Sequence, residues 1–101
     1  MENTITQEHI DEILAKTEVQ IMTVYDKCTV VMAKLPNGFV IVESSACVDK
    51  ANYNEEMGTQ ICIERIINKV WELEGYKLQC EVSNKEEETV ENVEEKKVEE
   101  E

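Results

Sequence analysis

Two cationic residues, Arg65 and Lys69, have the side-chain type and spacing that could bind a small anion. Arg65 is the only arginine among 101 residues, and Lys69 follows it four positions later. On a helix this spacing places both side chains on one face, and a guanidinium can hold a phosphate through two parallel hydrogen bonds. Together with Lys34 or Lys50 nearby, the pair could therefore form a compact site for a phosphorylated small ligand. The alternative is that the two cations pair with Glu64, Glu72 or a neighbouring subunit.

Hydroxyl and aromatic groups lie between the expected sheet and the helix that follows it. Ser44 and Ser45 offer hydroxyls, and Tyr53 offers one aromatic face. These groups could position the remainder of a nucleotide-like ligand whose phosphates contact the two cations. The alternative is structural, with Asp49 capping a helix and Tyr53 packing on the core. The five candidate ligand-binding residues are Arg65, Lys69, Ser44, Ser45 and Tyr53.

The other reactive residues give little support to catalytic or metal chemistry. His9 is the only histidine, and no motif supports a nucleophile–base pair between it and Cys47. The four cysteines are at least 15 residues apart, without the close ligand pairs typical of structural zinc sites. No glycine-rich phosphate loop is present. We therefore expect a protein that is not an enzyme and that carries no metal or cofactor.

The element that must carry both cations is a long helix in the second half of the chain. Asp49 or Asn54 can cap its start, and apolar residues recur at three- and four-residue intervals over residues 57–71. Gly58, inside the first turns, predicts a close packing contact. Gly75 is expected to end the helix in a left-handed cap. The alternating residues 76–82 then predict one last short strand at the edge of the sheet.

The first half of the chain predicts a short helix followed by three antiparallel strands. Thr6 is a favourable N-cap, and the aliphatic residues after it recur at helical spacing. Residues 19–25, 28–35 and 39–43 are rich in β-branched side chains, and LPNGF between the last two is the strongest turn signal. Apolar residues at alternate and intervening positions of the first strand predict cover on both of its faces. The expected fold is α+β, with two helices packed on a small antiparallel sheet built around a β-hairpin.

Charge and length limit the number of domains. The chain has 10 basic and 23 acidic residues, a net charge of −13, and residues 83–101 alone hold nine Glu and three Lys. We expect one domain over residues 1–82 and a disordered, acidic, low-complexity tail over residues 83–101.

Net charge and length also limit the classes of partner that the protein can bind. A strongly acidic chain argues against direct contact with nucleic acid or with an anionic membrane surface. The sequence shows neither an apolar run of 18 residues nor a signal peptide, which predicts a cytosolic protein. A core this small should leave an apolar face or edge, which predicts a homo-oligomer.

Several short motifs together carry a resemblance to a known family. They are Leu35-Pro36-Asn37-Gly38-Phe39, Ala46-Cys47-Val48-Asp49, Tyr53, Gly58 and Trp71-Glu72-Leu73-Glu74-Gly75-Tyr76. With them the chain resembles a family of small tailed-phage proteins named for gene product forty-nine of phage N-four and gene product sixty-six of phage Sf-six. The resemblance implies a phage or prophage gene expressed in a bacterial host cytoplasm. It implies no activity, because the family is one of unknown function.

Three functions agree with these observations. The first is a non-catalytic phage counter-defence protein that binds and sequesters a small nucleotide-derived immune signal. The second is a stoichiometric inhibitor that binds a host or defence enzyme, by acidic mimicry of DNA. The third is a structural or DNA-metabolism accessory protein of the phage. We prefer the first, because a small protein without a catalytic motif suits stoichiometric capture of an anionic ligand.

Overall fold

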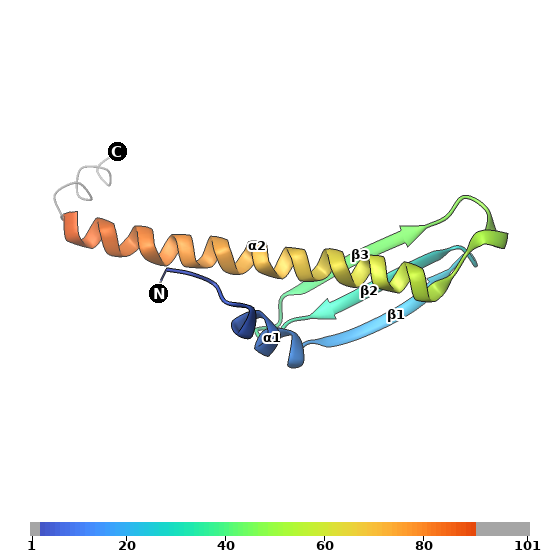
Figure 1. Ribbon diagram of the computed structural model, residues 1–101, viewed down its shortest axis with the longest axis horizontal. Helices are drawn as coiled ribbons and strands as arrows, with labels where there is room; N and C mark the ends of the chain where they lie inside the picture. Colours follow the sequence, from blue (N-terminus) through green and yellow to red (C-terminus); the bar gives the residue numbers. More distant parts are fainter. Residues whose placement is uncertain (1–2, 91–101) are drawn as a thin grey trace.

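The chain forms a three-stranded antiparallel sheet with one long helix lying across one face (Figure 1). The computed structural model describes residues 3–90, with side chains described as far as Lys85. The elements in chain order are α1 (Gln7–Ala15), β1 (Glu18–Val24), β2 (Cys28–Lys34), β3 (Val40–Ala46), the short 3-10 helix η1 (Lys50–Asn52) and α2 (Glu55–Val90). The predicted α+β class, with two helices and a sheet built around a hairpin, is confirmed.

The turn between β2 and β3 forms where LPNGF predicts it. The N–H of Leu35 donates to the carbonyl of Phe39, and the N–H of Gly38 donates to the carbonyl of Leu35, both at 2.8 Å. Gly38 has a φ of +97°, which a residue without Cβ adopts at little cost. The side chain of Asn37 accepts a hydrogen bond from the N–H of Phe39 at 3.0 Å. Local chemistry alone therefore accounts for this hairpin.

The turn between β1 and β2 places two ordinary residues in the left-handed region. Tyr25 has a φ of 55° and Asp26 a φ of 56°. The N–H of Lys27 donates to the carbonyl of Val24 at 3.2 Å. Two successive left-handed residues match the twist of the flanking strands, but this conformation is unfavourable for a tyrosine, whereas glycine, asparagine and aspartate tolerate it. This turn therefore carries local backbone strain.

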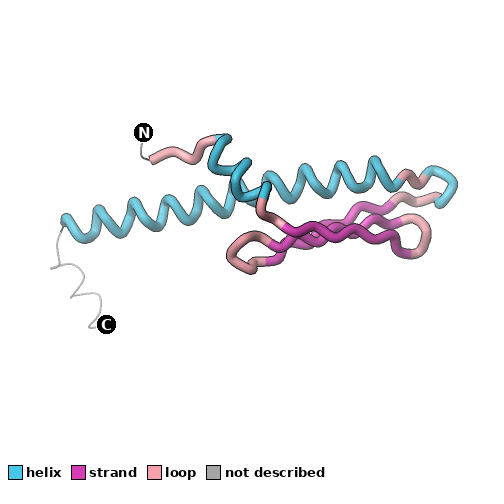
Figure 2. The backbone as a smooth tube through the Cα atoms, turned by 90° about the horizontal axis from the view of Figure 1, so that it is seen from below, coloured by secondary structure: helices cyan, strands magenta, loops and turns pink. Residues whose placement is uncertain are grey.

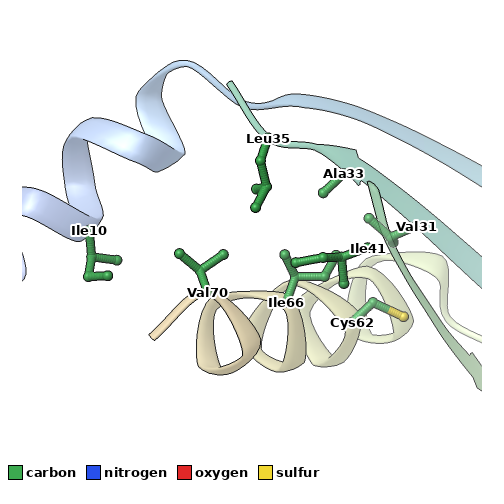
Figure 3. Packing of buried hydrophobic residues seen from close by; sticks show 8 residues of the cluster. All are labelled: Ile10, Val31, Ala33, Leu35, Ile41, Cys62, Ile66 and Val70. Carbon is green, nitrogen blue, oxygen red and sulfur yellow. The ribbon is translucent and has the colours of Figure 1, made fainter. Parts of the chain in front are cut away.

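The core lies between α2 and the face of the sheet formed by β2 and β3 (Figure 2). On α2, Cys62, Ile66 and Val70 recur every four residues and point at the sheet (Figure 3). Helix α1 closes one end of this core with Ile10, which is fully buried. The buried hydrophobic residues are Ile10, Val31, Ala33, Leu35, Ile41, Cys62, Ile66 and Val70. One contiguous apolar cluster thus joins both helices to the sheet.

Helix α2 does not end at Gly75, so the predicted left-handed cap there is wrong, and so is the strand over residues 76–82. Gly75 lies inside the helix, and its φ is not positive. Leu78 and Val82 are half-buried and four residues apart, so they continue the helical stripe. The alternation that suggested a strand is equally compatible with that helical spacing. A single glycine costs a helix only about 1 kcal/mol, which does not stop a helix with favourable residues on both sides.

The helix also crosses the expected boundary between domain and tail. Residues 83–90 continue α2, whereas residues 91–101 of the predicted disordered tail lie outside the described part of the chain. Within residues 3–90, no helix combines the length and apolar character needed to cross a membrane.

Strand β1 is exposed on both faces, contrary to the expected cover on both sides. Val19, Ile21 and Met22 have exposed fractions of 44%, 47% and 49%. The reason is the position of α2, which packs chiefly on β2 and β3 and contacts the outer strand near one end, where Thr23 donates to Glu55. About half of each of these three apolar side chains therefore remains exposed to solvent.

Candidate functional site

Arg65 and Lys69 lie one turn apart on α2, as their spacing predicts. Asn54 caps the helix, because its side-chain oxygen accepts a hydrogen bond from the N–H of Met57 at 3.1 Å. The side chains of Arg65 and Lys69 have exposed fractions of 53% and 46%. Both cations are therefore accessible from solvent.

An open hollow on the surface of α2 contains both cations. Its lining residues are Arg65, Asn68, Lys69, Trp71 and Glu72, and its volume is about 560 Å³. Asn68 and Trp71 were not among the predicted site residues. Helical spacing could have pointed to Asn68, which lies three positions after Arg65 on the same face of the helix. Trp71 lies six positions after Arg65, about 120° round the helix, so spacing gives no signal for it.

Each cation already has an acidic neighbour and leaves part of its hydrogen-bonding capacity unused. The Nη1 atom of Arg65 donates to the carbonyl oxygen of Ser44 at 2.9 Å and lies 4.0 Å from Oε1 of Glu43. Nζ of Lys69 lies 3.9 Å from Oε1 of Glu72. Exposed ion pairs of this kind contribute at most about 1 kcal/mol. An incoming phosphate could compete with these contacts.

Ser44 is therefore brought to Arg65, although through its backbone carbonyl and not its hydroxyl. Because β3 is an outer strand of the sheet, this contact ties α2 to the β3 edge. The predicted role of the Ser44 hydroxyl in holding a ligand has no counterpart in this contact.

Ser45 and Tyr53 lie in a different place from the two cations. They line a second hollow together with Asn52, Asn54, Met57 and Gly58. This second hollow shares no lining residue with the hollow that contains Arg65 and Lys69. Arg65 is ten residues beyond Glu55 at the start of α2, which is about 15 Å along the helix. The five predicted residues thus divide into two groups. Arg65, Lys69 and the backbone of Ser44 form one, and Ser45 and Tyr53 form the other.

Tyr53 belongs to a small cluster of hydroxyl groups beneath the start of α2. Its hydroxyl lies 2.6 Å from Oγ1 of Thr29 and 2.8 Å from Oγ1 of Thr23. Oγ1 of Thr23 also donates to Oε2 of Glu55 at 2.9 Å. Thr23 and Thr29 are directly opposite each other on β1 and β2. The cluster satisfies the buried Thr29 and fixes the entry to α2, which supports the structural alternative for Tyr53.

His9 and Cys47 make separate contacts, so they do not form a nucleophile–base pair. Nε2 of His9 lies 2.8 Å from Oε1 of Glu74, which ties α1 to α2. The thiol of Cys47 donates to the carbonyl oxygens of Lys27, at 3.8 Å, and of Asp49, at 3.3 Å. The only histidine therefore has a structural contact in this fold.

The cysteines are free thiols, and among residues 3–90 no group of three or more His, Cys, Asp or Glu side chains is arranged to hold a metal ion. Burial raises the pKa of the Cys62 thiol, and the nearby Arg65 cation offsets part of that rise. Cys62 lies in the core, where it packs as a small hydrophobic residue.

Comparison with known proteins identifies the family. The model of the phage protein (N4 Gp49/phage Sf6 gene 66) family matches residues 2–82. The chain belongs to this family. No curated protein and no solved structure matches it.

The N4 Gp49/Sf6 gene 66 match supports a phage origin for the chain. It includes the whole sheet, both hollows and the five predicted ligand-binding residues. It stops at residue 82, inside α2, so the last part of the helix and the acidic residues that follow lie outside the family match.

Proposed function

We propose that this phage protein is a non-catalytic binding protein that sequesters a small nucleotide-derived immune signal in the host cytoplasm. The observation that carries the proposal is the grouping of Arg65, Lys69, Asn68 and Trp71 around one open hollow on α2. These residues come from two successive turns of a helix that the core holds in place through Cys62, Ile66 and Val70. The hollow is thus built on a rigid element.

The four side chains supply the groups that a nucleotide needs. Arg65 and Lys69 can bind phosphate oxygens through charge-assisted hydrogen bonds. The indole of Trp71 can stack on a base, an interaction of about 1–3 kcal/mol. The amide of Asn68 can donate to and accept from a base or a ribose hydroxyl. No covalent step is required, because sequestration needs only binding.

The charge of the molecule supports this location for an anion. At a net charge of −13, most of the surface repels a phosphate. Arg65 and Lys69 concentrate two positive charges one helical turn apart, and their acidic neighbours Glu43 and Glu72 lie at 4.0 and 3.9 Å. A bound phosphate would take over these weak contacts.

Isothermal titration calorimetry against a panel of cyclic nucleotides and ADP-ribose derivatives tests the proposal. We expect one or more of these to bind the parent protein. Arg65→Gln and Lys69→Gln should each weaken that binding about 10- to 100-fold, the range of a hydrogen bond to a charged group. Trp71→Leu should also weaken binding to ligands that carry a base.

Lys50→Gln is the matched control, because it removes the same charge at a different site. Nζ of Lys50 is 4.0 Å from Oδ2 of Asp26, beside the turn between β1 and β2. The affinity of the Lys50→Gln variant for the ligand should stay within a factor of two of the affinity of the parent protein. If no ligand of the panel binds, or if Lys50→Gln weakens binding as much as Arg65→Gln does, the proposal is wrong.

The second candidate, an inhibitor that imitates DNA, is favoured by one observation. Helix α2 continues to Val90, so the backbone of the Glu86-Glu87-Glu88 run is ordered as a helix. A DNA mimic needs acidic residues on such a rigid element. The test is inhibition of a DNA-binding host enzyme that weakens with salt and is lost when all three glutamates are replaced by glutamine. Inhibition that the triple variant retains would exclude this mechanism.

A further inference from the structure

The two edges of the sheet differ in how their backbones are covered. At the β3 edge, Arg65 donates from α2 to the carbonyl oxygen of Ser44 at 2.9 Å. At the β1 edge, the contact with α2 is made by the side chain of Thr23, which donates to Glu55 near one end of the strand. Among the described residues, the backbone of β1 bonds only to β2 and within the adjoining turn. The outward N–H and C=O groups of β1 are therefore available.

Strand β1 also lacks the features that usually protect an edge strand. Its sequence, EVQIMTV, contains no proline, glycine or lysine. Six of its seven residues are exposed, among them Val19, Ile21 and Met22. Exposed apolar edge strands of this length pair readily with another strand, and burial of these side chains would favour that pairing.

We propose that β1 pairs with β1 of a second copy of this chain. The two strands run antiparallel about a two-fold axis at Ile21, and the two sheets join into one of six strands. In this register Glu18 lies opposite Val24 of the second copy, and Val19 lies opposite Thr23 of the second copy. Both copies present the same surface, as a two-fold interface requires.

The low charge of β1 allows two copies of this acidic protein to associate through that strand. Two chains of net charge −13 repel each other wherever acidic surfaces meet. Residues 19–24 carry no charge, and Glu18 is the only acidic residue of the strand. The proposed register places the two Glu18 side chains at opposite ends, about 20 Å apart at roughly 3.3 Å per residue. This exceeds the Debye length of about 8 Å at physiological salt.

The residues just beyond the strand are complementary in the same register. If the two-fold relation is continued past Glu18, Lys16 reaches the level of Asp26 of the second copy. Both side chains are exposed, and Asp26 lies in the turn that follows β1. The two-fold relation thus brings a cation of one copy and an anion of the other to the same end of the paired strands, where Asp26 also lies 4.0 Å from Nζ of Lys50 of its own chain.

Light scattering of the full chain at micromolar concentration tests this interface. We expect the parent protein to have twice the 11.6 kDa mass of one chain. Ile21→Lys places two like charges at the axis and should give a folded monomer, with folding checked by circular dichroism. Val42→Lys is the matched control, because Val42 is exposed on β3, on the face turned away from α2, and it should remain dimeric.

Three results would overturn the proposal. They are a monomeric parent, an Ile21→Lys variant that stays dimeric, and a Val42→Lys variant that dissociates to the same extent as Ile21→Lys. The last would move the interface to the open face of the sheet. Neither variant tests ligand binding, so a failed calorimetric titration would leave this result unaffected.

A cross-linking variant covers the case in which Ile21→Lys does not fold. Facing residues of antiparallel strands have Cα atoms about 4.5–5.5 Å apart, which a disulfide can span. In a Cys80→Ser background, which removes the exposed thiol, Ile21→Cys should form a covalent dimer on mild oxidation. Val42→Cys and the background alone should not. Failure of Ile21→Cys to cross-link would show that β1 does not pair as proposed.

Discussion

The α carbon of Gly58 on α2 lies directly against the side chain of Thr29 on β2. A Cβ atom placed on Gly58 would be 3.0 Å from Cβ of Thr29 and closer still to its Oγ1. Oγ1 of Thr29 is held in place by the hydroxyl of Tyr53 at 2.6 Å, so it cannot move freely. The predicted close packing contact at Gly58 is confirmed, and it sets how near the helix comes to the sheet.

Gly58→Ala should therefore destabilise the protein although alanine favours a helix. The gain in helix propensity is about 1 kcal/mol, whereas overpacking costs about 1–3 kcal/mol. We expect no gain and a net loss of up to about 2 kcal/mol in the free energy of unfolding, measured by urea denaturation. Gly58→Ala should cost less stability in a Thr29→Ala variant than in the parent protein, because the clashing Oγ1 atom is then absent.

Gly75→Ala is the matched variant and should have the opposite sign. Gly75 also lies inside α2, and nothing comes within 4 Å of a Cβ atom placed on it. Stability should rise by about 0.5–1 kcal/mol. A decrease would contradict a continuous helix at this position, since a left-handed cap penalises alanine.

Tyr25→Asn should stabilise the turn between β1 and β2. Tyr25 has a φ of 55° and its side chain is exposed, so the exchange sacrifices little packing. Asparagine tolerates the left-handed conformation that costs an ordinary residue roughly 1–2 kcal/mol. We expect a gain of about 0.5–1 kcal/mol in thermal or chemical unfolding. Tyr25→Ala, the control, should give no such gain.

The cysteines should differ in their rates of alkylation. Burial raises the pKa of the Cys62 thiol, so less thiolate is present at pH 8, and the side chain is shielded as well. Cys80 is exposed. With iodoacetamide and peptide mass spectrometry, Cys80 should react at least about tenfold faster, because thiolate is the reactive form. Denaturant should abolish the difference, and equal rates in the folded protein would contradict the burial of Cys62.

Removal of residues 84–101 should leave the fold intact. The buried cluster ends at Val70, and the half-buried Leu78 and Val82 also precede the cut. We expect the free energy of unfolding to change by less than about 0.5 kcal/mol. A larger loss would mean that the end of α2 or the residues after it contribute to the core.

Features governed by neighbouring residues could be read from the sequence. Thr6 caps α1 by accepting a hydrogen bond from the N–H of His9, and Asn54 caps α2. Gly38 takes the positive φ that the LPNGF turn needs. Each of these depends on contacts within a few residues, so their chemistry is contained in the local sequence.

The candidate site was predicted only in part for the same reason. The i, i+4 spacing of Arg65 and Lys69 is a property of one helix, and it holds. The predicted grouping of these cations with Ser45 and Tyr53 is not found, because it depends on how far along the sheet α2 extends. That distance depends on packing, which no local spacing contains.

Tertiary structure alone decided three further features. Gly75 is compatible with either a helix interior or a cap, and continued packing of Leu78 and Val82 favours the interior. The exposure of β1 follows from where α2 crosses the sheet. The bond from Arg65 to the carbonyl of Ser44 joins residues 21 positions apart. Hydrogen-bonding capacity and hydrophobic period belong to the sequence, but which surfaces meet depends on how the whole chain buries its apolar area.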